Sequence, residues 1–290
     1  MDGHFLAVDW GTTNRRVYSI DAGGAVIETE RDDRGVLAIA PGSFDAEAAG
    51  IRARFGDAPM LCAGMVGSKR GWHEIRYVPA PADFAAIARG TQWIDARRTA
   101  IVPGVCRLDD SRADVMRGEE VQFLGALEAG LVPDGAMLCQ PGTHCKWARV
   151  ADGRLVDFTT TMTGELFALL KQHSLLADLL DGDVGPNDGF LAGVRQAQGQ
   201  DLLSLLFSVR AARLLGSLPL EQSASFTSGL LIGSDVRARL TDPSEPVHVL
   251  ADAHLGGLYR CAIEELGGSA ILVDSHAAFV AGITRIWREL

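Results

Sequence analysis

Two Gly-Thr pairs, each following the end of a short apolar strand, are the part of the sequence best suited to bind an anion. Glycine lets the backbone approach an anion closely, and exposed N–H groups and threonine hydroxyls donate to phosphate oxygens. In both copies a cation stands three residues after the threonine. The first segment comprises Gly11, Thr12, Thr13, Asn14 and Arg15, and the second comprises Gly142, Thr143, His144, Cys145 and Lys146. The two segments therefore predict a pair of loops that hold a polyphosphate between two lobes.

Asp9 ends the first apolar run and would lie beside the bound phosphates. Because a carboxylate repels phosphate unless a cation lies between them, Asp9 is predicted to hold Mg²⁺. A turn-forming aspartate is the structural alternative. Arg15 and Lys146 either neutralise phosphate or are exposed strand charges, and His144 is a further candidate phosphate contact.

The segments around both loops repeat one order of strands and turns. Strands are predicted at 5–8, 17–20 and 25–29 with a turn at 21–24, and again at 136–139, 147–150 and 155–160 with a turn at 151–153. Tight turns of this composition are common in β regions, so two unrelated hairpins are the alternative. The shared order of strand, Gly-Thr, cation, turn and strand favours a duplication.

The rest of the chain alternates strands and helices, which is typical of α/β lobes. Further strands are predicted at 60–63, 100–102, 247–250 and 270–273, helices at 44–55, 118–129, 163–176, 202–215, 229–240, 255–266 and 276–290, and loops at 64–72 and 180–189. The helix over 118–129 would join the two lobes. Thr163 is predicted to N-cap its helix, and His173 lies on that helix's apolar face, which favours a core histidine over a catalytic one.

The composition excludes several other classes of protein. A formal net charge of −10, without a long lysine or arginine run, repels phosphate backbones and anionic lipid, so neither nucleic acid nor a membrane is predicted as a partner. Five scattered cysteines argue against a zinc site and for a reducing compartment. No leader-like basic segment and no apolar stretch of about 18 residues occurs. A cytoplasmic protein is predicted; the oligomeric state is left open, with a homodimer considered.

The motifs together resemble the 2-dehydro-3-deoxygalactonokinase family of the actin-like ATPase and sugar kinase superfamily. The resemblance covers nearly the full chain in order. The segments that carry it are residues 9–14, 64–68 with 71–72, 115–120, 141–147, 163–166 with 172–174, and 228–233.

This resemblance implies an α/β, two-lobed actin-like ATPase (ribonuclease H-like) fold with duplicated β-hairpin phosphate loops and an inter-lobe cleft. It places an N-terminal lobe at 1–129, joined by the terminal helix at 276–290, and a C-terminal lobe at 130–275. The implied activity is ATP-dependent phosphorylation of the 6-hydroxyl of 2-dehydro-3-deoxy-D-galactonate in galactonate breakdown. A kinase of the gluconate epimer, a phosphatase and a nucleotide-dependent sensor on the same scaffold are the alternatives.

Glu119 and Glu120 are the candidates for the carboxylate that orients the acceptor hydroxyl and takes its proton. They occupy the first turn of the helix over 118–129, where the helix dipole favours ionised carboxylates. A solvent-facing pair of charges is the alternative. Adjacent helical residues point about 100° apart, so one of the two at most faces the acceptor, and Glu119 is preferred.

The loop over 64–72 is predicted to bind the sugar acid. Its backbone, hydroxyl and cations suit a carboxylate, and an indole supplies an apolar wall; a plain surface loop is the alternative. The assigned residues are Gly67, Ser68, Lys69, Arg70 and Trp72, with Asn14 from the first phosphate loop.

Nucleotide contacts are assigned to both phosphate loops and to a turn before the helix over 255–266. They are Gly11, Thr12, Thr13, Gly142, Thr143, His144, Lys146, Asp252 and Gly256. Where sugar kinases usually have a glycine-rich turn against adenosine, this chain has Ala251-Asp252-Ala253-His254, and glycines follow only at Gly256 and Gly257.

Overall fold

The structure, a computed structural model, describes residues 3–96, 98–109, 112–199 and 201–290 and divides into two compact units. The first unit comprises residues 1–135, 148–158 and 274–290, and the second comprises 136–147 and 159–273. Residues 148–158 belong with the first unit because Leu155 pairs with Ala82, and Asp157 forms ion pairs with Arg107 and Arg112. Each unit is described below by itself.

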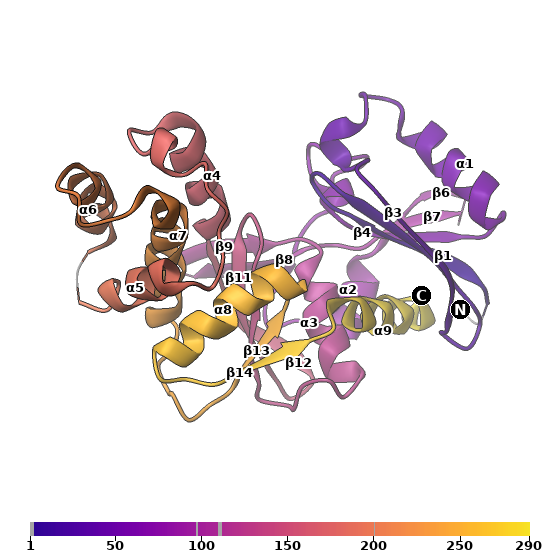
Figure 1. Ribbon diagram of the computed structural model, residues 1–290. Coiled ribbons are helices and arrows are strands. Elements are labelled where there is room, and N and C mark those ends of the chain that lie inside the picture. Colours follow the sequence, from indigo (N-terminus) through magenta and orange to yellow (C-terminus); the bar gives the residue numbers. More distant parts are fainter. Residues whose placement is uncertain (1–2, 97, 110–111, 200) are drawn as a thin grey trace. The chain divides into compact units, whose positions relative to one another are not determined.

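A six-stranded sheet in the order β3-β2-β1-β4-β7-β6 organises the first unit (Figure 1). Its strands are β1 (Phe5–Trp10), β2 (Arg15–Ile20), β3 (Val26–Asp32), β4 (Met60–Gly64), β6 (Gln92–Asp95) and β7 (Thr99–Ile101). The first three strands are antiparallel, whereas β1, β4 and β7 run parallel. A smaller sheet joins β5 (Val78–Pro79), β8 (Val105–Asp109) and β9 (Arg112–Met116), and α2 (Phe84–Gly90) precedes β6.

Alternate side chains of β1 pack against helices on opposite faces of the six-stranded sheet. Trp10 and its same-face neighbours join a core with α1 (Phe44–Phe55). Phe5, on the other face, stacks on Trp287 of α9 (Ser275–Glu289) at 4.7 Å between ring centroids. The terminal helix therefore belongs to the first unit.

Helix α9 also packs tightly on α3 (Glu119–Glu128). A Cβ on Gly125 would lie 1.9 Å from the Ala278 carbonyl oxygen, and one on Gly282 would lie 2.0 Å from the Val121 carbonyl oxygen. Only glycine permits this approach of two backbones, which fixes the position of α3 and of the two glutamates at its start.

A five-stranded sheet in the order β12-β11-β10-β13-β14 organises the second unit. The strands are β10 (Met137–Gln140), β11 (Cys145–Ala151), β12 (Arg154–Thr161), β13 (Val247–Leu250) and β14 (Ala270–Val273), and β11 and β12 continue into the first unit. Strands β10, β13 and β14 run parallel. The helices are α4 (Thr163–His173), α5 (Asp188–Gln196), α6 (Leu202–Leu214), α7 (Leu220–Arg237) and α8 (Ala253–Glu265). Short 3₁₀ turns lie at Val36–Ala38, Met65–Gly67 and Ala177–Leu179.

Most predicted elements are confirmed, including both hairpins that follow the phosphate loops. Several details were wrong. The helix predicted over 229–240 begins already at Leu220. The loop over 180–189 ends earlier, because Asn187 caps α5 by accepting from the Phe190 N–H. Met162, not Thr163, is the N-cap of α4, and His173 is exposed rather than in the core, because α4 buries none of its residues.

No helix within the described residues is long and apolar enough to cross a bilayer.

Candidate active site

The loop after β1 presents an exposed edge at Thr12, Thr13 and Asn14. It is closed by the Gly11 N–H, which donates to the Asn14 carbonyl at 2.9 Å. Gly35 lies so close beneath it that an added Cβ would be 2.4 Å from the Thr12 carbonyl oxygen. Hydrogen bonds from this neighbouring segment fix the backbone and leave the threonine side chains facing outward, as anion binding requires.

Asp9 lies at the carboxyl end of β1, between Arg16 on β2 and Ala63 on β4. Burial raises the pKa of Asp9 to about 6; Arg16 lowers it, and the nearby Glu119 raises it further. Within the described part of the chain no cluster of three or more metal-ligating side chains occurs, and Asp9 supplies one buried carboxyl group here. One such carboxyl group suits Mg²⁺, which is commonly held by one or two carboxylates, phosphate oxygens and water.

Two glycines bring the start of α3 to the end of β1. Gly64 has a φ of 95°, and a Cβ on it would lie 2.8 Å from the Trp10 carbonyl oxygen. Gly118 has a φ of 109° and would place a Cβ 3.1 Å from the Gly64 Cα. Side chains at these positions would strain the backbone. Asp9 and Glu119 are thus held close enough for their charges to interact.

The two glutamates at this helix start have different environments. Glu119 is half-buried, and its Oε2 accepts from the Arg117 N–H at 3.0 Å. Glu120 is fully buried, and both of its oxygens accept from the Gly118 N–H, at 2.9 and 2.7 Å. Burial, assisted by Glu119, raises the pKa of Glu120 to about 8. Glu119 is therefore the more accessible of the two glutamates, and Glu120 is a buried acid that fixes the turn.

Glu120→Gln is expected to weaken the pH dependence of stability between pH 5 and 8. The folded protein keeps the Glu120 proton up to about pH 8, whereas the unfolded chain releases it near its ordinary pKa of 4.5. Stability from this group is therefore full at low pH and is lost as pH rises, at up to about 1.4 kcal/mol per pH unit. Unfolding midpoints across this range measure the effect, with Glu28→Gln at an exposed position of β3 as the control. If the unfolding midpoints of wild type and Glu120→Gln changed with pH to the same extent, the raised pKa of Glu120 would be contradicted.

Arg15 and Lys146, the cations that follow the two Gly-Thr pairs, are both buried. The interpretation of these residues as exposed strand charges was therefore wrong. Arg15 is buried and pairs with Asp32 at 2.5 Å and Glu47 at 3.0 Å, with its guanidinium 5.0 Å from the Trp10 ring centre. Its charge is already compensated, so phosphate neutralisation is not supported either. Lys146 is buried and donates to the Thr160 hydroxyl at 2.8 Å.

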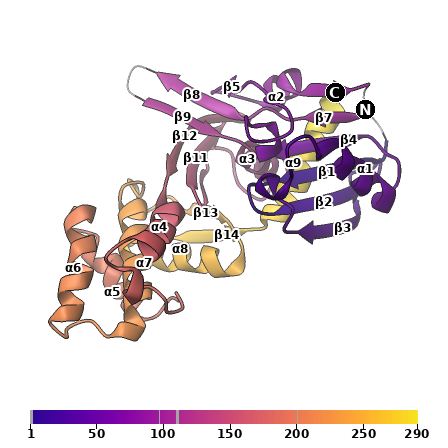
Figure 2. The same cartoon turned by 90° about the horizontal axis from the view of Figure 1, so that it is seen from above.

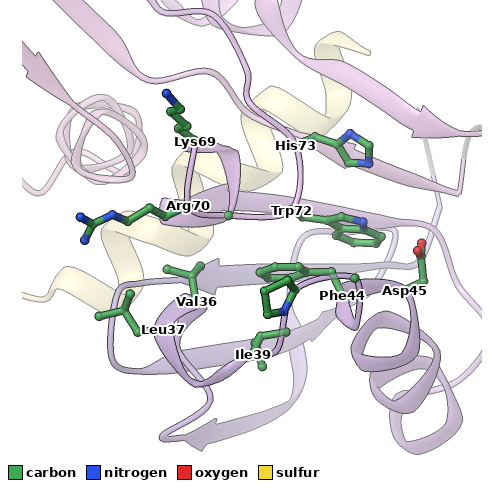
Figure 3. A pocket seen from close by; sticks show the side chains of 12 residues that line it. Val36, Leu37, Ile39, Phe44, Asp45, Lys69, Arg70, Trp72 and His73 are labelled. Atoms are coloured by element: carbon green, nitrogen blue, oxygen red, sulfur yellow. The ribbon is translucent and has the colours of Figure 1, made fainter.

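A pocket of about 720 Å³ lies in the first unit beside the loop over 64–72 (Figure 3). The Trp72 ring stacks on Phe44, with centroids 6.0 Å apart and an interplanar angle of 11°. Lys69 and Arg70 lie at the other end of the pocket and are exposed. The pocket therefore combines an aromatic wall with two cations, which suits a small organic anion.

Gly67 and Ser68 support this loop and do not line its pocket. The Ser68 hydroxyl donates to the Met65 carbonyl at 2.7 Å. A Cβ on Gly67 would lie 2.8 Å from Nη1 of buried Arg117, whose Nη2 donates to the Ile75 carbonyl. Arg117 and Phe44 were missed as site residues; the aromatic residue at the start of the helix over 44–55 was the available signal for Phe44.

The second phosphate loop is held by the start of α4, within the second unit. The Glu165 N–H donates to the Thr143 carbonyl at 2.8 Å, and a Cβ on Gly164 would lie 2.3 Å from the Gly142 carbonyl oxygen. The ring of His144 forms a 2.6 Å hydrogen bond with Glu165 and stays partly exposed. As in the first loop, a glycine from a neighbouring segment lies against the Gly-Thr backbone.

A second, mainly apolar pocket of about 180 Å³ adjoins this loop. Its lining residues are Gly142, Thr163, Gly164, Phe167, Val184, Ser228, Leu231, Ile232, His254, Leu255, Leu258 and Tyr259. Asp252, a predicted nucleotide contact, caps α8 by accepting from the Leu255 N–H at 2.9 Å, and Gly256 packs near Leu272. These two residues shape the first turn of α8, while His254 and Leu255 supply the pocket surface.

Asp235 on α7 holds the wall of this second pocket together. The carboxyl group is buried and accepts from Trp147 Nε1 at 3.1 Å and from the hydroxyls of Thr161, Thr163 and Tyr259 at 3.0, 3.1 and 3.0 Å. Burial above all raises the pKa of Tyr259 well above its ordinary value, so its phenol remains a donor. A lone aspartate in a helix gave no sequence signal for this role.

Asp235→Ala is expected to destabilise the second unit by on the order of 3 kcal/mol or more, because four donors would be left without their acceptor in a buried site. Asp235→Asn keeps one acceptor oxygen and should cost less. The measurement is the unfolding free energy in denaturant. Exposed Asp242, which bonds to Ser244 on its own turn, gives the control Asp242→Ala. Equal stability of the two alanine variants would contradict the role of Asp235.

Comparison with known proteins places the chain in one family. A family model described as 2-keto-3-deoxy-galactonokinase matches residues 9–286. The chain is 36% identical over 292 residues to the 2-dehydro-3-deoxygalactonokinase of Escherichia coli strain K12, covering 99% of this chain and 98% of that one.

Solved structures agree with this family assignment. A crystal structure from Sinorhizobium meliloti, described as a candidate 2-dehydro-3-deoxygalactonokinase, is 35% identical, covers 98% of this chain and 96% of its own, and has a TM-score of 0.90. At 11% identity, a Clostridium difficile activator of 2-hydroxyisocaproyl-CoA dehydratase shares the fold alone, with a TM-score of 0.52 over 99% of this chain and 95% of its own. The predicted two-lobed, actin-like α/β fold is confirmed. With a family model spanning the chain from Asp9 to α9 and a full-length relative above one-third identity, the protein belongs to the 2-keto-3-deoxy-galactonokinase family.

Proposed function

We propose that the protein is an ATP-dependent kinase that phosphorylates the 6-hydroxyl of 2-dehydro-3-deoxy-D-galactonate. The observation that carries the proposal is the pairing of Asp9 and Glu119 beside an exposed threonine loop, in a chain of the 2-keto-3-deoxy-galactonokinase family. Phosphoryl transfer to a hydroxyl needs positioned phosphates, compensation of their charge and a carboxylate near the acceptor oxygen.

In this proposal the exposed loop at 11–14 and the loop at 141–146 bind the phosphates of ATP. Asp9 would hold Mg²⁺, which supplies positive charge beside the transferred phosphoryl group. Glu119 orients the acceptor hydroxyl and accepts its proton, while Glu120 keeps its own proton and holds the turn. The base must be a carboxylate that is ionised at neutral pH. The buried Glu120, with its pKa raised to about 8, does not meet this requirement.

The apolar pocket of the second unit is proposed to take the adenosine of ATP. Phe167, Leu258 and Tyr259 offer apolar surface for a flat base, and Ser228 and His254 offer polar atoms that can bond to its edge or to the ribose. The adjacent Gly142 places this pocket next to the second phosphate loop. Base and phosphate contacts therefore lie side by side in one unit.

The larger pocket of the first unit is proposed to bind the sugar acid. Lys69 and Arg70 would bind the carboxylate and 2-keto oxygen, and the stacked rings of Phe44 and Trp72 would lie against the carbon that lacks a hydroxyl. The pocket is also lined by Val36, whose N–H donates to the Gly11 carbonyl. The sugar-acid pocket thus lies beside the segment that supports the first phosphate loop.

Arg70→Ala is expected to raise the KM for the sugar acid by roughly 10- to 100-fold with little change in kcat, because one charge-assisted hydrogen bond to the substrate is lost in both ground and transition states. Steady-state kinetics at saturating ATP measure the effect. Arg76, an exposed arginine that does not line the pocket, gives the control Arg76→Ala. An unchanged KM in Arg70→Ala would contradict the proposal that Arg70 binds the carboxylate of the sugar acid in this pocket.

ADP release with and without the sugar acid tests the reaction class. A kinase releases ADP only when the sugar acid is present, in step with its consumption. Equal release without it would indicate hydrolysis by water, as in a phosphatase. Tight nucleotide binding without turnover under either condition would indicate a sensor. We further propose that the reaction takes place in the cytoplasm, which supplies ATP and suits the five free cysteines.

A further inference from the structure

Helix α6 of the second unit carries apolar side chains both on the face that packs against the core and on the opposite, exposed face. Its inner face packs Leu205 and Val209 into a core with α7. On the opposite face Leu203, Phe207 and Leu214 are 80%, 66% and 74% exposed. Figures 1 and 2 both show α6 at the margin of the second unit, with α7 on its inner side. We define Leu203, Phe207, Arg210 and Leu214 as the outer seam of α6.

The apolar area around this seam is large for a surface in contact with water. Leu175, whose carbonyl accepts from Arg210 Nη1 at 3.4 Å, and Leu215, next to Leu214 in sequence, flank it and are 72% and 84% exposed. With Leu203, Phe207 and Leu214 these flanks form an apolar patch on the order of a few hundred Å², the kind of patch that marks an interaction site on a water-exposed surface. A standard interface buries about 800 Å² on each partner, part of it a polar rim. The patch is therefore sufficient for the apolar centre of a stable interface.

The spacing along the seam indicates what covers it. Leu203, Phe207, Arg210 and Leu214 follow one another at intervals of four, three and four residues, which is the spacing of the contact positions of a coiled coil. Such a seam is complementary to another helix of the same spacing. A groove for an extended peptide or a lipid surface would not require this spacing.

We propose that the outer seam of α6 pairs with the same helix of a second copy of this chain, antiparallel across a two-fold axis. The antiparallel register places Leu203 against Leu214 of the partner subunit, and Phe207 against Arg210 of the partner subunit. The guanidinium then lies on an aromatic ring, twice by symmetry, which is a favourable cation–π contact. A parallel pair would instead place the two Arg210 guanidinium groups against each other. This inference does not depend on the proposed kinase activity.

The mass of the full-length protein in solution tests the pairing. Light scattering and sedimentation should give twice the chain mass of 30.9 kDa for wild type. Phe207→Glu and Leu203→Glu should raise the dimer dissociation constant by roughly 100-fold or more. Leu108→Glu, at a leucine of β8 that is 81% exposed, is the matched control and should remain dimeric. A wild type that is monomeric at every soluble concentration overturns the proposal, as does a dimer that survives both α6 substitutions.

Disulfide trapping tests the orientation. In the antiparallel pair, a mixture of Leu203→Cys and Leu214→Cys proteins should form a cross-linked heterodimer on mild oxidation, while neither variant should cross-link alone. Wild type oxidised in parallel corrects for the five native cysteines. Cross-linking of each variant with itself would overturn the antiparallel arrangement, and no cross-link in the mixture would overturn the seam.

Discussion

Glu119→Gln is expected to lower kcat for the sugar acid by roughly 10²- to 10⁴-fold, the range typical for loss of a general base. KM should change little, because the amide keeps the size of the side chain and its oxygen can still accept from the Arg117 N–H. Glu120→Gln should have a much smaller effect on kcat, because Glu120 is fully buried and bonds to its own turn. The pair of variants is compared by steady-state kinetics at saturating ATP and Mg²⁺.

The opposite ranking of these two variants would move the base to Glu120. If neither variant lowered kcat by more than a few-fold, the glutamate pair would be a structural feature of the helix start. A loose phosphoryl-transfer transition state needs little proton removal, so catalysis by positioning alone would then explain turnover.

Asp9→Asn is expected to remove most turnover while the protein stays folded. A carboxylate that holds a cation at the transferred phosphoryl group contributes several kcal/mol, so kcat should fall by roughly 10²-fold or more. Folding should be unaffected, because asparagine has the same size and carries no buried charge. Kinetics with Mg²⁺, together with the unfolding temperature, measure both effects.

Near-normal activity of Asp9→Asn would contradict the metal role of this strand residue. A large loss of unfolding temperature in the same variant would indicate a structural role instead. Only the combination of a folded protein and lost turnover supports the proposed site.

The two hairpins and helix α1 were predictable because the sequence patterns that indicate them are local. Short apolar runs and Gly-containing turns marked β1 to β3 and β10 to β12, and the bounds of α1 were predicted to the residue. The start of α7 was missed because this helix is buried almost all round, so it lacks an amphipathic pattern. Helix α4 shows the converse: its spacing predicted a buried face, but none of its residues is buried.

Parts of the candidate site followed from the sequence in a similar way. Residue type and position identified Asp9 and the glutamate pair, yet the difference between Glu119 and Glu120 depends on the contact of Gly118 with Gly64, which is 54 positions away in sequence. The compensation of Arg15 by Asp32 and Glu47 likewise depends on tertiary packing. Sequence spacing gives the residues near a site, while burial and partners decide which of them are free to react.

The most direct measurement of the central claim is kcat/KM with ATP across a panel of 2-keto-3-deoxy sugar acids, with the phosphorylated position of each product determined by NMR. The account predicts the highest kcat/KM for 2-dehydro-3-deoxy-D-galactonate and a phosphate on its 6-hydroxyl. A clear preference for the gluconate epimer, phosphorylation at another hydroxyl, or ADP release that is independent of every sugar acid would contradict it.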